Sequence, residues 1–128
     1  ENLFKKLGIQ PQYVGENAKI ENSLISGGTE VEGTVINSVI GSTVKIGKGA
    51  IVKDSVIFAD SKIEASAKVN YSIIDEKVTI GNNVNVGARK ADAVEIAVIG
   101  RGTIVHDNAK VEAGANIEEE VFAQKEAK

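Results

Sequence analysis

An aliphatic side chain recurs about every six residues through most of this chain, and this period constrains the fold more than any other feature. The clearest run consists of Ile40, Ile46, Val52, Ile57, Ile63, Val69, Ile74, Ile80 and Val86. Neither the 3.6-residue period of an amphipathic helix nor the alternation of a half-buried strand fits this spacing. A six-residue period is expected when short strands with one inward aliphatic residue alternate with corners, so that three strands close one coil of a solenoid.

Two neighbouring positions support a three-sided coil. The third residue after the aliphatic position is often Gly or Asn, as at Gly28, Gly49 and Asn83, and these residue types tolerate the positive φ of a tight corner. The fourth residue is small or β-branched, which suits a second inward side chain near the corner. Its members are Ala18, Thr29, Val44, Ala50, Ser61, Ala67, Val78, Val84, Thr103, Ala109 and Ala115. The pattern predicts an all-β parallel β-helix of about six coils.

The whole chain, residues 1–128, is expected to form a single β-helix domain. The predicted parts are an N-terminal cap over 1–10, regular coils over 11–86, a corner loop insertion over 87–95, the last coils over 96–117 and a C-terminal cap helix over 118–128. The cap helix is predicted because this segment opens with acids and closes with lysines, the order that favours a helix dipole.

Two local irregularities add to this prediction. Leu3, Phe4 and Leu7 lie at near-helical spacing before Gly8, which makes the N-terminal cap a second candidate helix. Val31, Ile36 and Ile40 are closer together than six residues, so the first full coil is expected to be shortened near residues 34–38.

Composition limits the possible partners and cofactors. The net charge is −3, with 15 basic and 18 acidic residues spread along the chain, so no basic stripe for nucleic acid is expected. No apolar run is long enough for a bilayer and no secretion signal is present, so no membrane partner and a cytoplasmic location are expected. With no cysteine and one histidine, neither a thiolate metal site nor a three-histidine zinc site is available, and no cofactor is expected in this chain.

Few residues are candidates for chemistry. Arg89 and Lys90 fall in the predicted loop and could contact an anionic effector or a partner, although a solvated loop is the favoured interpretation. His106 is the one candidate general base. It follows the inward Val105, so we expect it to point outward near Asp107 in a structural role. No other residue is proposed as catalytic.

The segment from Ala18 to Gly87 resembles a known family. The matching stretches are Asn22-Ser23-Leu24-Ile25, Glu32-Gly33-Thr34-Val35, Asn37-Ser38-Val39-Ile40, Val44-Lys45-Ile46-Gly47-Lys48-Gly49-Ala50 and Asp54-Ser55-Val56-Ile57. They resemble the C-terminal domain of bacterial glucose-1-phosphate adenylyltransferases (ADP-glucose pyrophosphorylases) and their glycogen-biosynthesis paralogue. The resemblance implies a left-handed parallel β-helix that serves subunit assembly and helps to transmit control by sugar-phosphate effectors.

In that family, catalysis belongs to an N-terminal α/β domain with a glycine-rich phosphate loop. Gly27-Gly28-Thr29 is the nearest match here, but it lacks the Arg-Leu of that loop and does not open a helix. The chain also has no methionine, so we expect an upstream segment that holds the catalytic domain and packs against the β-helix. A homo-oligomer formed through the β-helix is expected as well.

Two other functions remain open at this point. A hexapeptide-repeat acyltransferase would use His106 as its base at a groove between neighbouring prisms. A purely structural oligomerisation module would bind no ligand at all.

Overall fold

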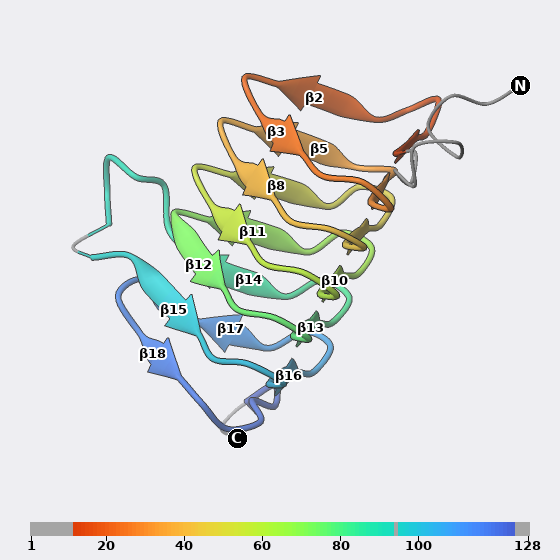
Figure 1. Cartoon of the computed structure of the whole chain (residues 1–128). Helices are drawn as coiled ribbons and strands as arrows, with labels where there is room; N and C mark the ends of the chain where they lie inside the picture. The colour runs from red at the N-terminus through yellow and green to blue at the C-terminus, as the bar shows by residue number, and fades with distance from the viewer. Residues whose placement is uncertain (1–11, 94, 125–128) are drawn as a thin grey trace, which may run out of the picture.

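The chain folds into a three-sided prism built from short strands. The computed structural model describes residues 12–93 and 95–124. Eighteen strands follow one another around the prism, and strands of like position in successive coils pair in parallel (Figure 1). They form three six-stranded sheets, one on each side. The predicted all-β parallel β-helix of about six coils is therefore confirmed.

We name the three sides sheets A, B and C. Sheet A contains β1 (Tyr13–Val14), β4 (Glu30–Val31), β7 (Lys45–Ile46), β10 (Lys62–Ile63), β13 (Thr79–Ile80) and β16 (Ile104–Val105). Sheet B contains β2 (Lys19–Glu21), β5 (Thr34–Ile36), β8 (Ile51–Lys53), β11 (Lys68–Asn70), β14 (Asn85–Gly87) and β17 (Lys110–Val111). Sheet C contains β3 (Leu24–Ile25), β6 (Val39–Ile40), β9 (Val56–Ile57), β12 (Ser72–Ile74), β15 (Ala97–Ile99) and β18 (Asn116–Ile117).

The core is made of aliphatic columns that run along the prism axis. Ile46, Ile63 and Ile80 are aligned in the parallel pairs of sheet A, so they lie one above another. Each is at most 2% exposed. Burial of one such side chain contributes about 1.5–3 kcal/mol. The six-residue period of the sequence therefore marks the inner wall of the prism.

The second inward position lies next to the corners, as predicted. Ala50 and Ala67 have no exposed surface, and neither do Val44 and Val78 at the same position of other coils. The corner residues beside them take positive φ in most coils. Those found with positive φ at this position are Gly28, Thr43, Gly49, Asp60, Ser66, Lys77, Asn83, Gly102, Asn108 and Gly114.

A serine ladder stabilises the corner between sheets B and C. The Oγ of Ser38 donates to the carbonyl of Ile36 at 2.8 Å and accepts from the backbone N–H of Ser55, one coil further on, at 3.1 Å. Ser55 makes the equivalent bond to the N–H of Ser72, again at 3.1 Å. The serine of the repeated Asn/Asp-Ser motif thus connects successive coils through buried hydrogen bonds.

The second coil has a shortened corner. Only residues 32 and 33 separate β4 from β5, whereas residues 47–50 separate β7 from β8 in the next coil. The predicted shortening is confirmed, but its predicted place near residues 34–38 is wrong. The inward residue of β5 is Val35, which has no exposed surface, and Ile36 lies on the outer side. The missing residues are therefore in the corner between sheets A and B.

An inserted loop leaves the prism at the corner between sheets B and C. Gly87, which was expected to begin the insertion, completes β14 and pairs with Asn70. The loop consequently runs over residues 88–96, up to β15, and projects beyond the stacked coils (Figure 1). The core continues undisturbed past it, because β15 pairs with β12 in parallel register.

The C-terminal segment is not the predicted helix. Residues 118–124 are non-helical, and Val121 forms a parallel bridge to Val105 at the end of sheet A. The N–H of His106 donates to the Val121 carbonyl at 2.8 Å, and the Val121 N–H donates to the Ile104 carbonyl at 3.1 Å. These bonds pair backbone groups at the open end of sheet A that a helix would have left unpaired. This gain explains why the order of acids and lysines in residues 118–128 wrongly predicted a helix. Residues 125–128 of the predicted helix lie outside the described residues.

The predicted N-terminal cap over residues 1–10 also lies outside the part of the chain that the structure describes. Within residues 12–93 and 95–124, no helix has the length and apolar character needed to cross a membrane.

Candidate functional site

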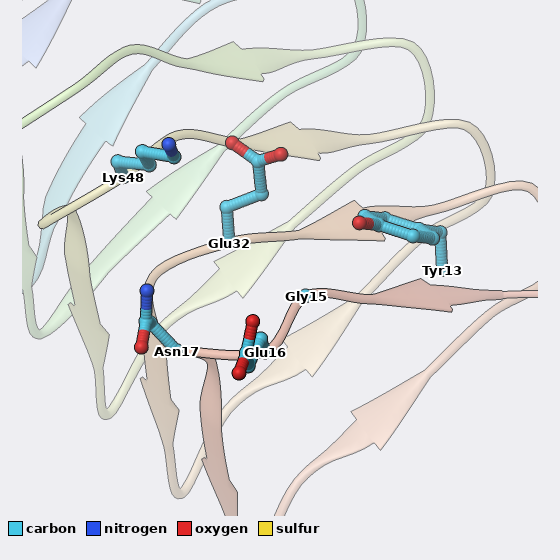
Figure 2. A pocket seen from close by; sticks show the side chains of 6 residues that line it. All are labelled: Tyr13, Gly15, Glu16, Asn17, Glu32 and Lys48. Carbon is cyan, nitrogen blue, oxygen red and sulfur yellow. The ribbon is translucent and has the colours of Figure 1, made fainter.

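The shortened corner leaves a notch between the first and third coils. The notch holds about 210 Å³ of space and is lined by Tyr13, Gly15, Glu16, Asn17, Glu32 and Lys48. Figure 2 shows Tyr13 on β1, Glu16 and Asn17 at the corner that follows β1, Glu32 on the shortened coil and Lys48 at the corner of the coil beyond. Two carboxylates against one ammonium make this notch a poor site for a phosphate group.

The close approach of the second coil to the third explains the shape of the notch. A Cβ atom built on Gly33 would lie 2.4 Å from the Ala50 carbonyl oxygen and 2.7 Å from the Gly47 carbonyl oxygen. Only glycine fits there, so the shortened corner is drawn inward against the backbone of the next coil. The sequence predicts the shortening but not the hollow that it creates.

The structure places Arg89 and Lys90 in the 88–96 loop. The Nε of Arg89 lies 2.8 Å from the Oδ2 of Asp92, and both side chains are largely exposed. The ammonium of Lys90 lies over the ring of Tyr71, 5.8 Å from its centroid. The two cations are therefore neighbours on an exposed loop, although the Arg89 guanidinium already has a carboxylate partner within the loop.

His106 lies at the end of sheet A, against the C-terminal segment. Its Nε2 is 2.8 Å from the Oε2 of Glu120, and its ring stacks on Phe122 with a centroid distance of 4.2 Å and an interplanar angle of 7°. Asp107, the expected neighbour, instead accepts hydrogen bonds from Asn82. The partners of His106 were not identified from the sequence, because they lie across a corner and in a segment predicted to be helical.

No described group of three or more His, Cys, Asp or Glu side chains is arranged to hold a metal ion. His106 and the notch also lie apart: His106 is on the last coil, and the notch lies between the first and third coils. The more extensive feature is a flat outer face.

The outer side of sheet C carries an aliphatic stripe. Parallel pairing places its members in register, one in each of five successive coils: Leu24, Val39, Val56, Ile73 and Val98. Leu24 is 66% exposed and Val39 47% exposed. The sequence signal for this stripe is the repeated Asn/Asp-Ser-aliphatic-Ile motif, whose third residue points outward, but no exposed aliphatic face was predicted from it.

Comparison with known proteins connects this prism to a family. The family model "GlmU-like, C-terminal hexapeptide" matches residues 9–105. The glucose-1-phosphate adenylyltransferase of Desulfitobacterium hafniense (strain DSM 10664 / DCB-2) is 30% identical over 112 residues, which cover 85% of this chain and 28% of that enzyme. The enzyme of the same name from Fervidobacterium nodosum is 35% identical over 118 residues, with the same two shares.

These matches lie in the C-terminal part of the adenylyltransferases, and the chain spans little more than a quarter of their length. Among solved structures, the acetyltransferase domain of PglB from Neisseria gonorrhoeae, in complex with acetyl coenzyme A, has a TM-score of 0.62. It is 19% identical, and the match covers 92% of this chain and 55% of that chain. At this identity the likeness concerns the fold alone. The fold, the repeat and the family model agree: this chain belongs to the GlmU-like C-terminal hexapeptide family.

Proposed function

We propose that this chain is the C-terminal assembly and regulatory domain of a glucose-1-phosphate adenylyltransferase of glycogen biosynthesis. The observation that carries the proposal is its similarity, over 85% of its length, to the C-terminal part of enzymes with that name. The parent protein would transfer the adenylyl group of ATP to glucose 1-phosphate and release pyrophosphate in the cytoplasm. Catalysis would belong to an N-terminal domain of the same polypeptide.

The geometry is consistent with a domain that assembles subunits and transmits regulation by an effector. A prism whose interior is filled by aliphatic columns is stiff, and its corners present the same position repeatedly at a spacing of about 4.8 Å. Catalytic groups need to converge on one point, whereas His106 and the residues of the notch lie on separate coils. The aliphatic stripe of sheet C is a surface that a protein partner can cover.

The 88–96 loop is the proposed contact for a sugar-phosphate effector or for the catalytic domain. Arg89 and Lys90 provide two exposed cations on one loop, next to the prism corner at Tyr71. The notch lined by Glu16, Glu32 and Lys48 is less suitable for such an anion, because carboxylates outnumber the cation.

An acyltransferase using His106 is supported less well. The Nε2 of His106 is already in contact with Glu120, and the ring is covered on one face by Phe122. A general base must have its nitrogen within reach of the acceptor's proton, so the C-terminal segment would have to move before His106 could act.

The proposed activity is tested on the complete gene product. Purified enzyme is incubated with ATP, glucose 1-phosphate and a divalent cation, and pyrophosphate and ADP-glucose are measured. The proposal predicts product formation that depends on both substrates. Absence of ADP-glucose, or equal turnover when acetyl-CoA and a sugar amine replace the substrates, would contradict it.

The regulatory part needs a separate measurement. The double variant Arg89→Ala/Lys90→Ala is expected to reduce the activation ratio produced by sugar phosphates. Lys68→Ala, which removes an exposed cation from sheet B, is the matched control. An unchanged activation ratio in the loop variant would exclude the loop as the effector contact.

A further inference from the structure

The aliphatic stripe of sheet C distinguishes this face of the prism from the other two. On sheet A the outward positions in register are Tyr13, Glu30, Lys45, Lys62, Thr79 and Ile104. On sheet B the corresponding positions are Lys19, Thr34, Ile51, Lys68, Asn85 and Lys110. The first five coils of sheet C instead present only Leu or β-branched aliphatic side chains. A contiguous aliphatic face of this kind marks a protein contact.

At the level of the fourth coil, charges of opposite sign lie at the two edges of the stripe. Lys90 reaches the edge at which the strands of sheet C begin, because its ammonium lies over Tyr71, just before β12. Asp75 and Glu76 lie at the other edge, directly after β12. The fourth coil therefore has a cation at one end of its sheet C strand and two carboxylates at the other end.

We infer that a second copy of this chain covers the stripe, related to the first by a two-fold axis parallel to the prism axis. Such an axis places each coil opposite the same coil of the second copy and reverses the strand direction. Every aliphatic residue of the stripe then meets its own equivalent. The axis also exchanges the two edges, so Lys90 of each copy faces Asp75 and Glu76 of the other. The interface is isologous, and the favourable charge contact occurs twice.

The alternative two-fold, perpendicular to the prism axis, is less favourable. It would keep each edge against the same edge of the second copy, so Lys90 would lose its acidic partners. If this axis passed through the third coil, at the centre of the stripe, Asp54 of one copy would face Asp54 of the other. Like charges that face each other across an interface are unfavourable. The charge distribution therefore selects the parallel arrangement of the prisms.

The size of the stripe sets the expected strength of the dimer. Five rungs at about 4.8 Å by one strand width make a patch of a few hundred Å², against about 800 Å² per partner in a standard stable interface. The dimer formed by this face alone is expected to be reversible, with dissociation in the micromolar range or weaker. This inference rests on the proposed assembly role and specifies its partner and its face.

Cysteine cross-linking tests the arrangement directly, because the chain has no native cysteine. Under the parallel two-fold, Val39→Cys, Val56→Cys and Ile73→Cys should each form a covalent dimer on mild oxidation. Ile51→Cys, at a partly exposed aliphatic position of sheet B, is the matched control and should remain monomeric. If only Val56→Cys formed a covalent dimer, the parallel arrangement would be overturned. If none of the three variants cross-linked more than the control, the interface itself would be overturned.

Charge reversal tests the edges of the interface. In sedimentation velocity from about 10 µM to about 1 mM, Lys90→Glu should shift the dimerisation curve to at least tenfold higher concentration. The combination Lys90→Glu/Glu76→Lys should restore it, while Lys68→Glu on sheet B should leave it unchanged. Failure of the double variant to recover would contradict the facing of these edges.

The same variants are then examined in the complete gene product. In that protein, the cysteines introduced at Val39, Val56 and Ile73 could resist a thiol-labelling reagent while no cross-linked dimer forms. Another part of the polypeptide would then cover the face, and the inference would be wrong. Dimerisation does not depend on enzyme turnover, so loss of the interface and absence of adenylyltransferase activity give separate results.

Discussion

The imidazole Nε2 of His106 lies 2.8 Å from the Oε2 of Glu120, which is 14 residues further along the chain. This contact joins the last coil to the segment that closes the prism. The same histidine stacks on Phe122, so two interactions hold one short segment against the end of sheet A.

Removal of this contact should loosen the C-terminal segment without unfolding the prism. In Glu120→Ala, amide exchange of His106 and Val121 should accelerate, because their N–H groups form the hydrogen bonds that join β16 to the C-terminal segment. The change in global stability should stay within about 1 kcal/mol, since the pair is partly exposed. Hydrogen exchange followed by mass spectrometry measures the effect. Glu119→Ala is the adjacent control, and equal exchange in the two variants would contradict the role of the pair.

Enlargement of the small inward position should strain the prism. Ala50 has no exposed surface, so the larger side chain of Ala50→Leu must displace its neighbours. We expect a loss of about 1–3 kcal/mol in the free energy of unfolding. Chemical denaturation gives this value, and Ala91→Leu, at an exposed loop position, is the control. An unchanged midpoint for Ala50→Leu would refute the inward assignment.

Interruption of the serine ladder should cost a buried hydrogen bond. Ser55→Ala removes the Oγ that accepts from the Ser72 N–H at 3.1 Å and donates to the Lys53 carbonyl at 2.8 Å. The Ser72 N–H is then left without its partner, which destabilises the fold by about 1–3 kcal/mol. Ser42→Ala, at an exposed corner, should have little effect on thermal unfolding. Equal melting temperatures for the two variants would count against the ladder.

The shortened corner should tolerate no side chain. In Gly33→Ala the new methyl group would lie 2.4 Å from the Ala50 carbonyl oxygen, so backbone must move. We expect a loss of about 3 kcal/mol or more. Gly102→Ala is the comparison: its φ is +74°, but no atom lies within 4 Å of the added carbon, so a cost of about 1–2 kcal/mol is expected. A smaller loss of stability in Gly33→Ala than in Gly102→Ala, measured from denaturation curves, would contradict this prediction. It would show that the backbone at the shortened corner can move to accommodate a side chain.

Some features could not be predicted from the sequence, because they depend on contacts between distant segments. The charge order of residues 118–128 favours a helix, yet Val121 pairs with Val105 because an open sheet edge is available beside it. Val35 and Ile36 are adjacent aliphatic residues, and the sequence does not show which one points inward. The register with Val52 on the next coil places Val35 inside.

The sequence by itself determined the architecture: a six-residue aliphatic period with small residues and positive-φ corners fits only a stack of three-sided coils. It did so because each coil repeats the same local requirement, so the signal accumulates along the chain. The partners of His106, the notch beside Gly33 and the aliphatic stripe of sheet C were decided only by the tertiary structure. Each consists of residues from different coils or from a segment beyond the coils, and only the stacking of the chain brings them side by side.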